Sequence, residues 1–211
     1  MPSRSETPGA RRPVTPWGMD TVELDSPSAQ VLADEAGIIA DLQFVMECCK
    51  RLLTELAEAD EDRDGVVPLA LWSAAVVGYG RCFTTGKRFG LRTADVKALP
   101  LHGAVLKFHQ WVLAEGRKLT AHPASPFEAA KVGAALSGDG ARVEGIAVLS
   151  ASRVLVDSVG VRQLGGLASE LAKQIADRAR EHQDAALADA EQLGAESLAR
   201  LPVLQSGPPS S

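Results

Sequence analysis

The sequence predicts a mainly α-helical protein, a four-helix bundle with a small β insertion before the last helix. Two observations support this fold class. Apolar residues recur at steps of three and four over four long segments. Between residues 131 and 157 the pattern changes to short apolar runs around a Gly-rich turn. The 211 residues, 45% of them hydrophobic, are enough to bury a sizeable core.

The first helix is predicted over residues 27–59. Ser26 is suited to accept hydrogen bonds from the first free amides, and Pro27 stands where a missing N–H costs nothing. The apolar residues of this helix alternate at steps of four and three: Ile38, Leu42, Val45, Cys49, Leu52 and Leu56. This spacing makes one narrow apolar stripe, which packs either inside a bundle or across a dimer.

Three further helices are predicted over residues 68–84, 101–119 and 161–201. Each carries apolar residues at helical spacing, which indicates one buried face. These predicted core residues are Trp72, Val76, Tyr79 and Phe83 in the second helix, Leu101, Val105, Phe108 and Val112 in the third, and Leu164, Leu167, Leu171 and Ile175 in the last.

The β insertion is predicted at about residues 131–157. Two apolar runs, 132–136 and 143–149, flank a turn that contains Gly138 and Gly140. A Gly-rich turn between two short apolar runs is typical of a β-hairpin. Residues 154–156 are a candidate third strand.

The two ends of the chain are predicted to be disordered. Residues 1–25 form a leader with four prolines and little to bury, and residues 202–211 form a polar tail. Residues 26–201 are then one helical domain. No apolar run reaches the roughly 18 residues of a membrane span. Adjacent Cys48 and Cys49 indicate reduced thiols, so we expect a cytoplasmic protein without membrane contact.

Charge is distributed unevenly along the chain. The net charge of −5 disfavours a protein that coats nucleic acid. Residues 1–65 carry 6 basic and 14 acidic residues, whereas residues 66–122 carry 8 basic and 2 acidic residues, a net +6. A locally basic centre attracts phosphate, so we expect any contact with nucleic acid to be confined to a small cleft.

The sharpest chemical signal is at the end of the third predicted helix, where Arg117 precedes His122 by five residues. Pro123 disfavours the helical conformation at His122, so the helix is expected to stop just before the histidine. The imidazole is then free to turn back toward the arginine. Arginine holds phosphate oxygens and stays charged, while histidine titrates near neutral pH and transfers protons.

This Arg117–His122 segment resembles the Arg-x4–6-His motif of the HEPN superfamily. The region from Tyr79 to Arg88 also resembles the second helix of bacterial HEPN-like proteins. The resemblance covers about residues 30–130, and the last helix fits as the fourth of the bundle. Many members of this family are metal-independent endoribonucleases of toxin–antitoxin and phage-defence systems, and they act as homodimers with a composite cleft.

The resemblance implies a reaction and a set of site residues. Arg117 would stabilise the charge that develops on phosphorus. His122 would act as acid or base while the ribose 2′-OH attacks, leaving a 2′,3′-cyclic phosphate. No metal or other cofactor is implied, and a cognate antitoxin is a possible partner.

Lys118 leaves a second function open, because family nucleases commonly carry Asn or Asp directly after the arginine. A lysine can bind phosphate instead, or the site can be catalytically silent. The alternative function is therefore a module that binds RNA, a nucleotide or a protein partner. Its substrate-binding residues would be Lys118, Arg81, Lys87 and Arg88. The apolar stripe at 38–56 and the long last helix are candidate protein interfaces.

Two sequence patterns resemble metal-binding sites, but each lacks required ligands. Residues 60–65 match the first half of a calcium loop, but Leu71 stands where a bidentate glutamate is needed. An acidic interhelical loop is the better interpretation. His102 and His109 lie seven residues apart, on one face of the third predicted helix, without a carboxylate or thiol at ligand spacing. We expect both to be surface or partly buried residues rather than ligands.

Overall fold

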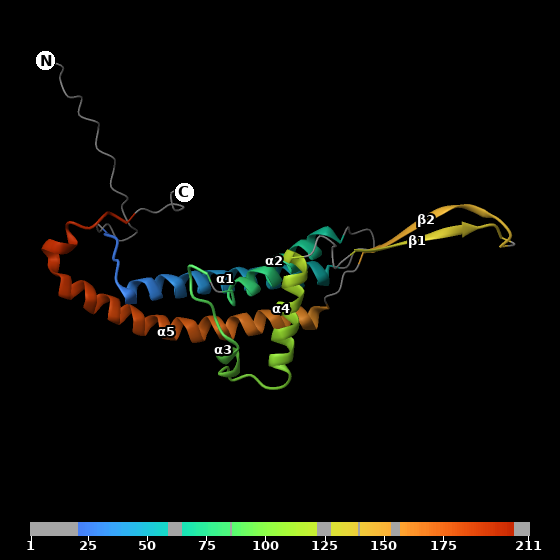
Figure 1. The fold of residues 1–211 in the computed structure, drawn as a ribbon. Helices are drawn as coiled ribbons and strands as arrows, with labels where there is room; N and C mark the ends of the chain where they lie inside the picture. The colour runs from blue at the N-terminus through green and yellow to red at the C-terminus, as the bar shows by residue number, and fades with distance from the viewer. Residues whose placement is uncertain are drawn as a thin grey trace, which may run out of the picture. The chain divides into compact units, whose positions relative to one another are not determined.

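The computed structural model describes residues 21–58, 65–84, 86–121, 128–138, 140–152 and 157–204. This part of the chain contains five helices and one two-stranded antiparallel sheet (Figure 1). The prediction of a mainly α protein with a small β insertion is confirmed at this level. The chain divides into two compact units: residues 34–179, and the two chain ends up to residue 33 and from residue 180.

The four predicted helices are present with small shifts at their ends. They are α1 (Pro27–Ala57), α2 (Val66–Arg81), α4 (Val105–Ala121) and α5 (Ser158–Leu198). A fifth helix, α3 (Thr93–Lys97), was not predicted. Five residues are too few to show a helical period. The Asp95 carboxylate accepts a hydrogen bond from the backbone N–H of Arg92 at 2.6 Å, which caps its first turn.

The apolar stripe of α1 is the centre of the core in residues 34–179. Ile38, Leu42, Val45 and Leu52 have no exposed surface. A Cβ atom at Gly165 of α5 would lie 3.4 Å from the Cβ of Cys49, so α5 packs closely on this stripe. Of the two alternatives that the sequence left open, packing inside the chain is therefore correct.

The N-terminal part of the third predicted helix was placed wrongly. Gly103 has φ +85°, a left-handed conformation, and α4 begins only at Val105. Leu101 therefore lies before the helix and is 37% exposed, so it is not a core residue. Val112 is buried as predicted.

A buried ion pair joins α1 to α5. Glu35 has no exposed surface, and its carboxylate accepts a hydrogen bond from Nε of Arg178 at 2.6 Å. The same guanidinium lies 3.4 Å from Asp95 of α3 and 5.6 Å from the centre of the Phe89 ring. Arg178 thus holds three segments together that are distant in sequence.

The β insertion is a hairpin of β1 (Glu128–Leu136) and β2 (Val143–Ser152) (Figure 1). Its turn is closed by a hydrogen bond from the Ser137 N–H to the Arg142 carbonyl at 2.8 Å. Gly140 has φ +71°, which explains the need for glycine in this turn. The hairpin is confirmed; residues 154–156 of the candidate third strand lie outside the described residues.

The hairpin has one continuous apolar face. Cross-strand partners share a face, and the register pairs Val132 with Val148 and Ala134 with Ile146. The register then shifts between Ala135 and Leu136, so that Leu136 pairs with Val143. The large side chains of this face are between 57% and 70% exposed. The other face carries the pairs Lys131–Leu149 and Gly133–Ala147. The six paired residues of the first face are called the hairpin face below.

The two chain ends pair with each other. Val22 forms an isolated antiparallel bridge with Val203, and the Glu23 N–H donates to the Pro202 carbonyl at 2.7 Å. The inner edges of the predicted leader and tail are therefore structured rather than disordered. Residues 1–20 and 205–211 lie outside the described residues.

The three cysteines, Cys48, Cys49 and Cys82, are free and buried. Burial raises the pKa of the Cys49 and Cys82 thiols to about 12, which keeps both protonated and unreactive. Among the residues with a described position, no helix is both long and apolar enough to cross a membrane.

Candidate anion-binding site

Two of the predicted site residues meet in one pocket. Arg81, the last residue of α2, and Arg117, near the end of α4, both line a cavity of about 220 Å³. Gly80, Thr84 and Gly116 are among its other lining residues. We call it the arginine pocket. The two arginines belong to helices that are separate in sequence, and the packing of α2 on α4 brings both residues to one cavity.

The two glycines of the arginine pocket have different roles. A Cβ atom at Gly116 would lie 3.4 Å from the carbonyl oxygen of Val76, so the missing side chain lets α4 approach α2 closely. A Cβ atom at Gly80 would meet no atom within 4 Å, so this position opens the pocket.

Arg117 is available to bind a ligand. Its side chain is exposed and forms no hydrogen bond or ion pair with any residue in the described ranges. Arginine side chains carry a positive charge in proteins. The Thr120 hydroxyl donates to the Gly116 carbonyl at 3.0 Å, so it is already used within the helix. The positive charge of the pocket therefore comes from its arginines.

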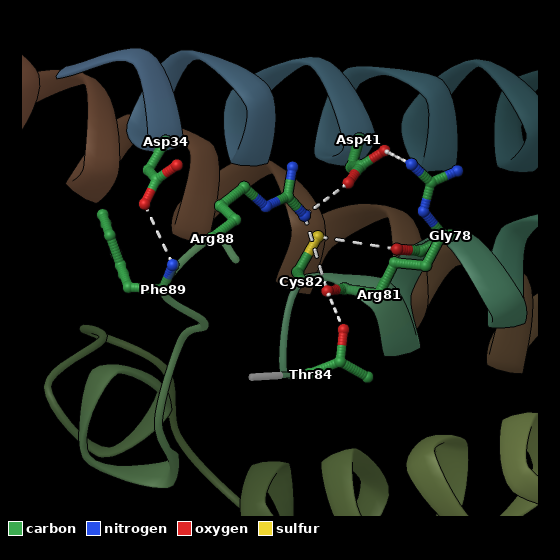
Figure 2. A network of polar contacts seen from close by, with 8 residues as sticks. All are labelled: Asp34, Asp41, Gly78, Arg81, Cys82, Thr84, Arg88 and Phe89. Atoms are coloured by element: carbon green, nitrogen blue, oxygen red, sulfur yellow. Dashed lines mark hydrogen bonds and ion pairs between the residues drawn. The ribbon is translucent and has the colours of Figure 1, made fainter. Parts of the chain in front are cut away.

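Arg81 and Arg88 share one carboxylate, Asp41 of α1, at 3.4 Å and 2.8 Å (Figure 2). Arg88 is the more buried of the two, with 29% of its side chain exposed against 66% for Arg81. A Cβ atom at Gly37 would lie 2.8 Å from an Arg88 guanidinium nitrogen. Arg88 thus clamps α1 to the loop after α2, while Arg81 keeps most of its surface open.

Of the other predicted site residues that the structure describes, Lys118, Lys87 and Arg88 do not line the arginine pocket. Lys118 lies one position beyond Arg117, but its ammonium pairs with Glu115 at 2.6 Å. Lys87 is exposed in the loop after α2. His122 lies outside the described residues, as do residues 60–64 of the calcium-like loop. The structure describes α4 as far as Ala121, the residue before His122.

A buried tyrosine–histidine pair lies next to the lining of the arginine pocket. The Tyr79 hydroxyl lies 2.8 Å from Nδ1 of His109, and both side chains are almost fully buried. Both rings pack on Phe83, which lines the arginine pocket. Burial lowers the pKa of His109 and raises that of Tyr79, so both are neutral at pH 7. This pair is a structural element.

The sequence missed this role of His109. It placed His102 and His109 on one helical face, but His102 lies in the loop before α4, so that placement was wrong. The helical spacing of His109 with Val105 and Val112 is the signal that could have located it on the buried face. Within the described ranges, no group of three or more metal-ligating side chains comes together.

Comparisons with protein-family models, curated proteins and solved structures give no match to this chain. The basis for assigning a function is therefore the arginine pocket together with the motif at the end of α4.

Proposed function

We propose that the protein is a metal-independent endoribonuclease of HEPN type. It would cleave single-stranded RNA to a 2′,3′-cyclic phosphate in a toxin or phage-defence role. The observation that carries the proposal is the convergence of Arg81 and Arg117 on one pocket. An arginine beside a small cavity suits a phosphodiester, because a guanidinium can hold phosphate oxygens with paired hydrogen bonds. The Arg81 guanidinium lies 3.4 Å from Asp41, so Arg117 is the main phosphate-binding group of the proposal. A small pocket also agrees with the net charge of −5, which disfavours broad RNA coating.

The proposed reaction is an internal transfer of the phosphoryl group. The ribose 2′-OH loses its proton to a base, its oxygen forms a bond to phosphorus, and the bond from phosphorus to the 5′-oxygen breaks. The leaving 5′-oxygen takes up a proton. Arg117 stabilises the charge that develops on the phosphate oxygens. His122, the residue after α4, is the proton-transferring group, so two copies of the chain would supply one base and one acid.

Incubation of the purified protein with a labelled single-stranded RNA in EDTA tests the proposal. We expect cleavage products that end in a 2′,3′-cyclic phosphate, identified by mass spectrometry. The His122→Ala variant is expected to lose roughly 100-fold or more of the cleavage rate, the size of a general acid–base contribution. Cleavage that EDTA abolishes, or that persists at full rate in His122→Ala, would contradict this mechanism.

A homodimer is part of the proposal, and the hairpin face is the surface that supports it. A two-stranded hairpin is marginally stable by itself, and an exposed apolar patch is typical of an interface. All six residues of the hairpin face are uncharged, so two identical faces can meet without like-charge repulsion. This favours a second copy of the chain as the partner, in a symmetric dimer. The stripe of α1 is not available, because it is buried within the chain.

The dimer is tested with a matched pair of hairpin variants. Ile146 and Leu149 are 70% and 72% exposed but lie on opposite faces. We expect Ile146→Glu to weaken dimerisation by about 100-fold, because it buries a charge in the interface. Leu149→Glu should leave the dissociation constant unchanged. Sedimentation velocity over a concentration series measures both, and a wild-type monomer at every concentration would contradict the proposed interface.

Lys118 favours one alternative, a catalytically silent module that binds RNA or a nucleotide. In HEPN nucleases a small polar residue commonly follows the arginine, whereas Lys118 here pairs with Glu115. The cleavage assay separates the two functions when binding is measured in parallel. Salt-sensitive RNA binding through Arg81 and Arg117 without turnover would favour the silent module.

A further inference from the structure

Helix α4 lines a second and larger cavity, of about 540 Å³. Its walls come from α4, from the loop before it and from the first turns of α5. Phe108 lines this cavity and Arg117 lines the arginine pocket. These residues are nine positions apart, which at about 100° per residue places them about 180° apart around the helix. The second cavity is therefore separate from the proposed RNA site.

The floor of the second cavity is apolar. Leu167 of α5 is 2% exposed, Phe108 is half-buried, and Trp111 is 40% exposed with its ring 5.7 Å from that of Phe108. Gly166 lies beside Leu167 in the wall, and a Cβ atom there would meet no atom within 4 Å. The missing side chain at Gly166 therefore contributes directly to the hollow.

The mouth of the second cavity is cationic. Lys107 and Arg162 both line it and both have exposed side chains. The guanidinium of Arg162 donates to the Ser158 hydroxyl at 3.1 Å, which leaves its other nitrogens free for a ligand. No acidic residue is found among the lining residues that the structure describes. An apolar floor below two cations matches a ligand with an apolar body and an anionic head.

We propose that this cavity binds an amphipathic carboxylate, an acyl chain of medium length. The chain would lie on Phe108, Trp111 and Leu167, with the carboxylate between Lys107 and Arg162. A cavity of this volume is within the usual range for small-molecule sites. His102 and Gln163 also line the cavity and offer hydrogen bonds to the polar edge of a base, so AMP is the competing ligand in the test.

Isothermal titration calorimetry of the full chain with decanoate, below its micelle concentration, tests the proposal. We expect one saturable site, with decyltrimethylammonium bound at least about tenfold more weakly because its head is cationic. Lys107→Glu should weaken decanoate binding by about tenfold, since it reverses a charge at the mouth. Lys50→Glu is the matched control: Lys50 is an exposed lysine of α1 that does not line the cavity, and its change should leave the affinity unaltered.

A second variant fills the cavity. Gly166→Leu places a side chain in the cavity. Leucine has a much higher helix propensity than glycine, so α5 should be retained. We expect decanoate affinity to fall by about tenfold or more while the unfolding temperature is maintained. Absence of saturable decanoate binding, equal affinity for decyltrimethylammonium, or unchanged binding in Lys107→Glu would overturn the proposal. Tighter binding of AMP than of decanoate would do so as well, and would assign the cavity to nucleotides.

Discussion

Replacing Arg117 with alanine is expected to lower the RNA cleavage rate by roughly 100-fold or more, the usual loss when a group that stabilises transition-state charge is removed. The free energy of unfolding should change by less than about 0.5 kcal/mol. Arg117 is exposed and has no partner within the described part of the chain, so its loss leaves no buried group unsatisfied. Single-turnover cleavage assays and urea titrations measure the two quantities.

Two further variants make the Arg117 prediction specific. Arg117→Lys keeps the charge but loses the paired hydrogen bonds of the guanidinium, so we expect an intermediate rate. Arg200→Ala is the control, since Arg200 is 75% exposed and lies outside the arginine pocket. Full cleavage activity in Arg117→Ala would show that the arginine pocket is not the cleavage site, even if the protein is a nuclease.

Replacing Arg178 with alanine is expected to lower the free energy of unfolding by about 3 kcal/mol, the lower end of the range for breaking a buried ion pair. Glu35 is fully buried and would lose the cation 2.6 Å away. The lower end applies because 34% of the Arg178 side chain is exposed. Contacts with Asp95 and Phe89 would be lost at the same time. Urea unfolding followed by circular dichroism measures the change.

The double variant Glu35→Leu/Arg178→Leu separates the charge effect from lost packing. Removing both charges avoids a buried carboxylate that has lost the Arg178 cation, so we expect the double variant to be more stable than Arg178→Ala. Lys173→Ala is the control on α5, because its ion pair with Glu170 is exposed and should contribute less than about 1 kcal/mol. A loss below about 1 kcal/mol in Arg178→Ala would contradict the structural role of this pair.

Much of the helical structure could be predicted because its signals are local. The alternating steps from Ile38 to Leu52 placed the buried side of α1, and each of these apolar residues is buried. The Gly-rich turn between two apolar runs placed the hairpin for the same reason, since turn geometry depends on a few neighbouring residues. Leu101 shows the limit of a prediction from apolar spacing. It fits the helical period, but Gly103 adopts a left-handed conformation, and the helix begins only after it.

The environments of the site residues could not be predicted from local sequence signals. A basic segment with Arg81, Arg88 and Arg117 could be recognised from composition, but their different environments could not. Arg81 and Arg88 both pair with Asp41 of α1, and Arg81 lines one pocket together with Arg117. These partnerships join residues that are far apart in the chain, and no helical period or turn motif encodes them. The burial of His109 against Tyr79 belongs to the same class.

The sequence by itself determined the fold class, the four long helices, the hairpin and a basic centre that contains the Arg117 motif. Repeating apolar spacing and turn chemistry act over a few residues, and that is why the order of amino acids alone reveals them. Only the tertiary structure decided that α4 presents Arg117 to one pocket and Phe108 to another, and that Arg178 neutralises Glu35. Those outcomes depend on which helix faces pack together, and packing is a property of the whole chain.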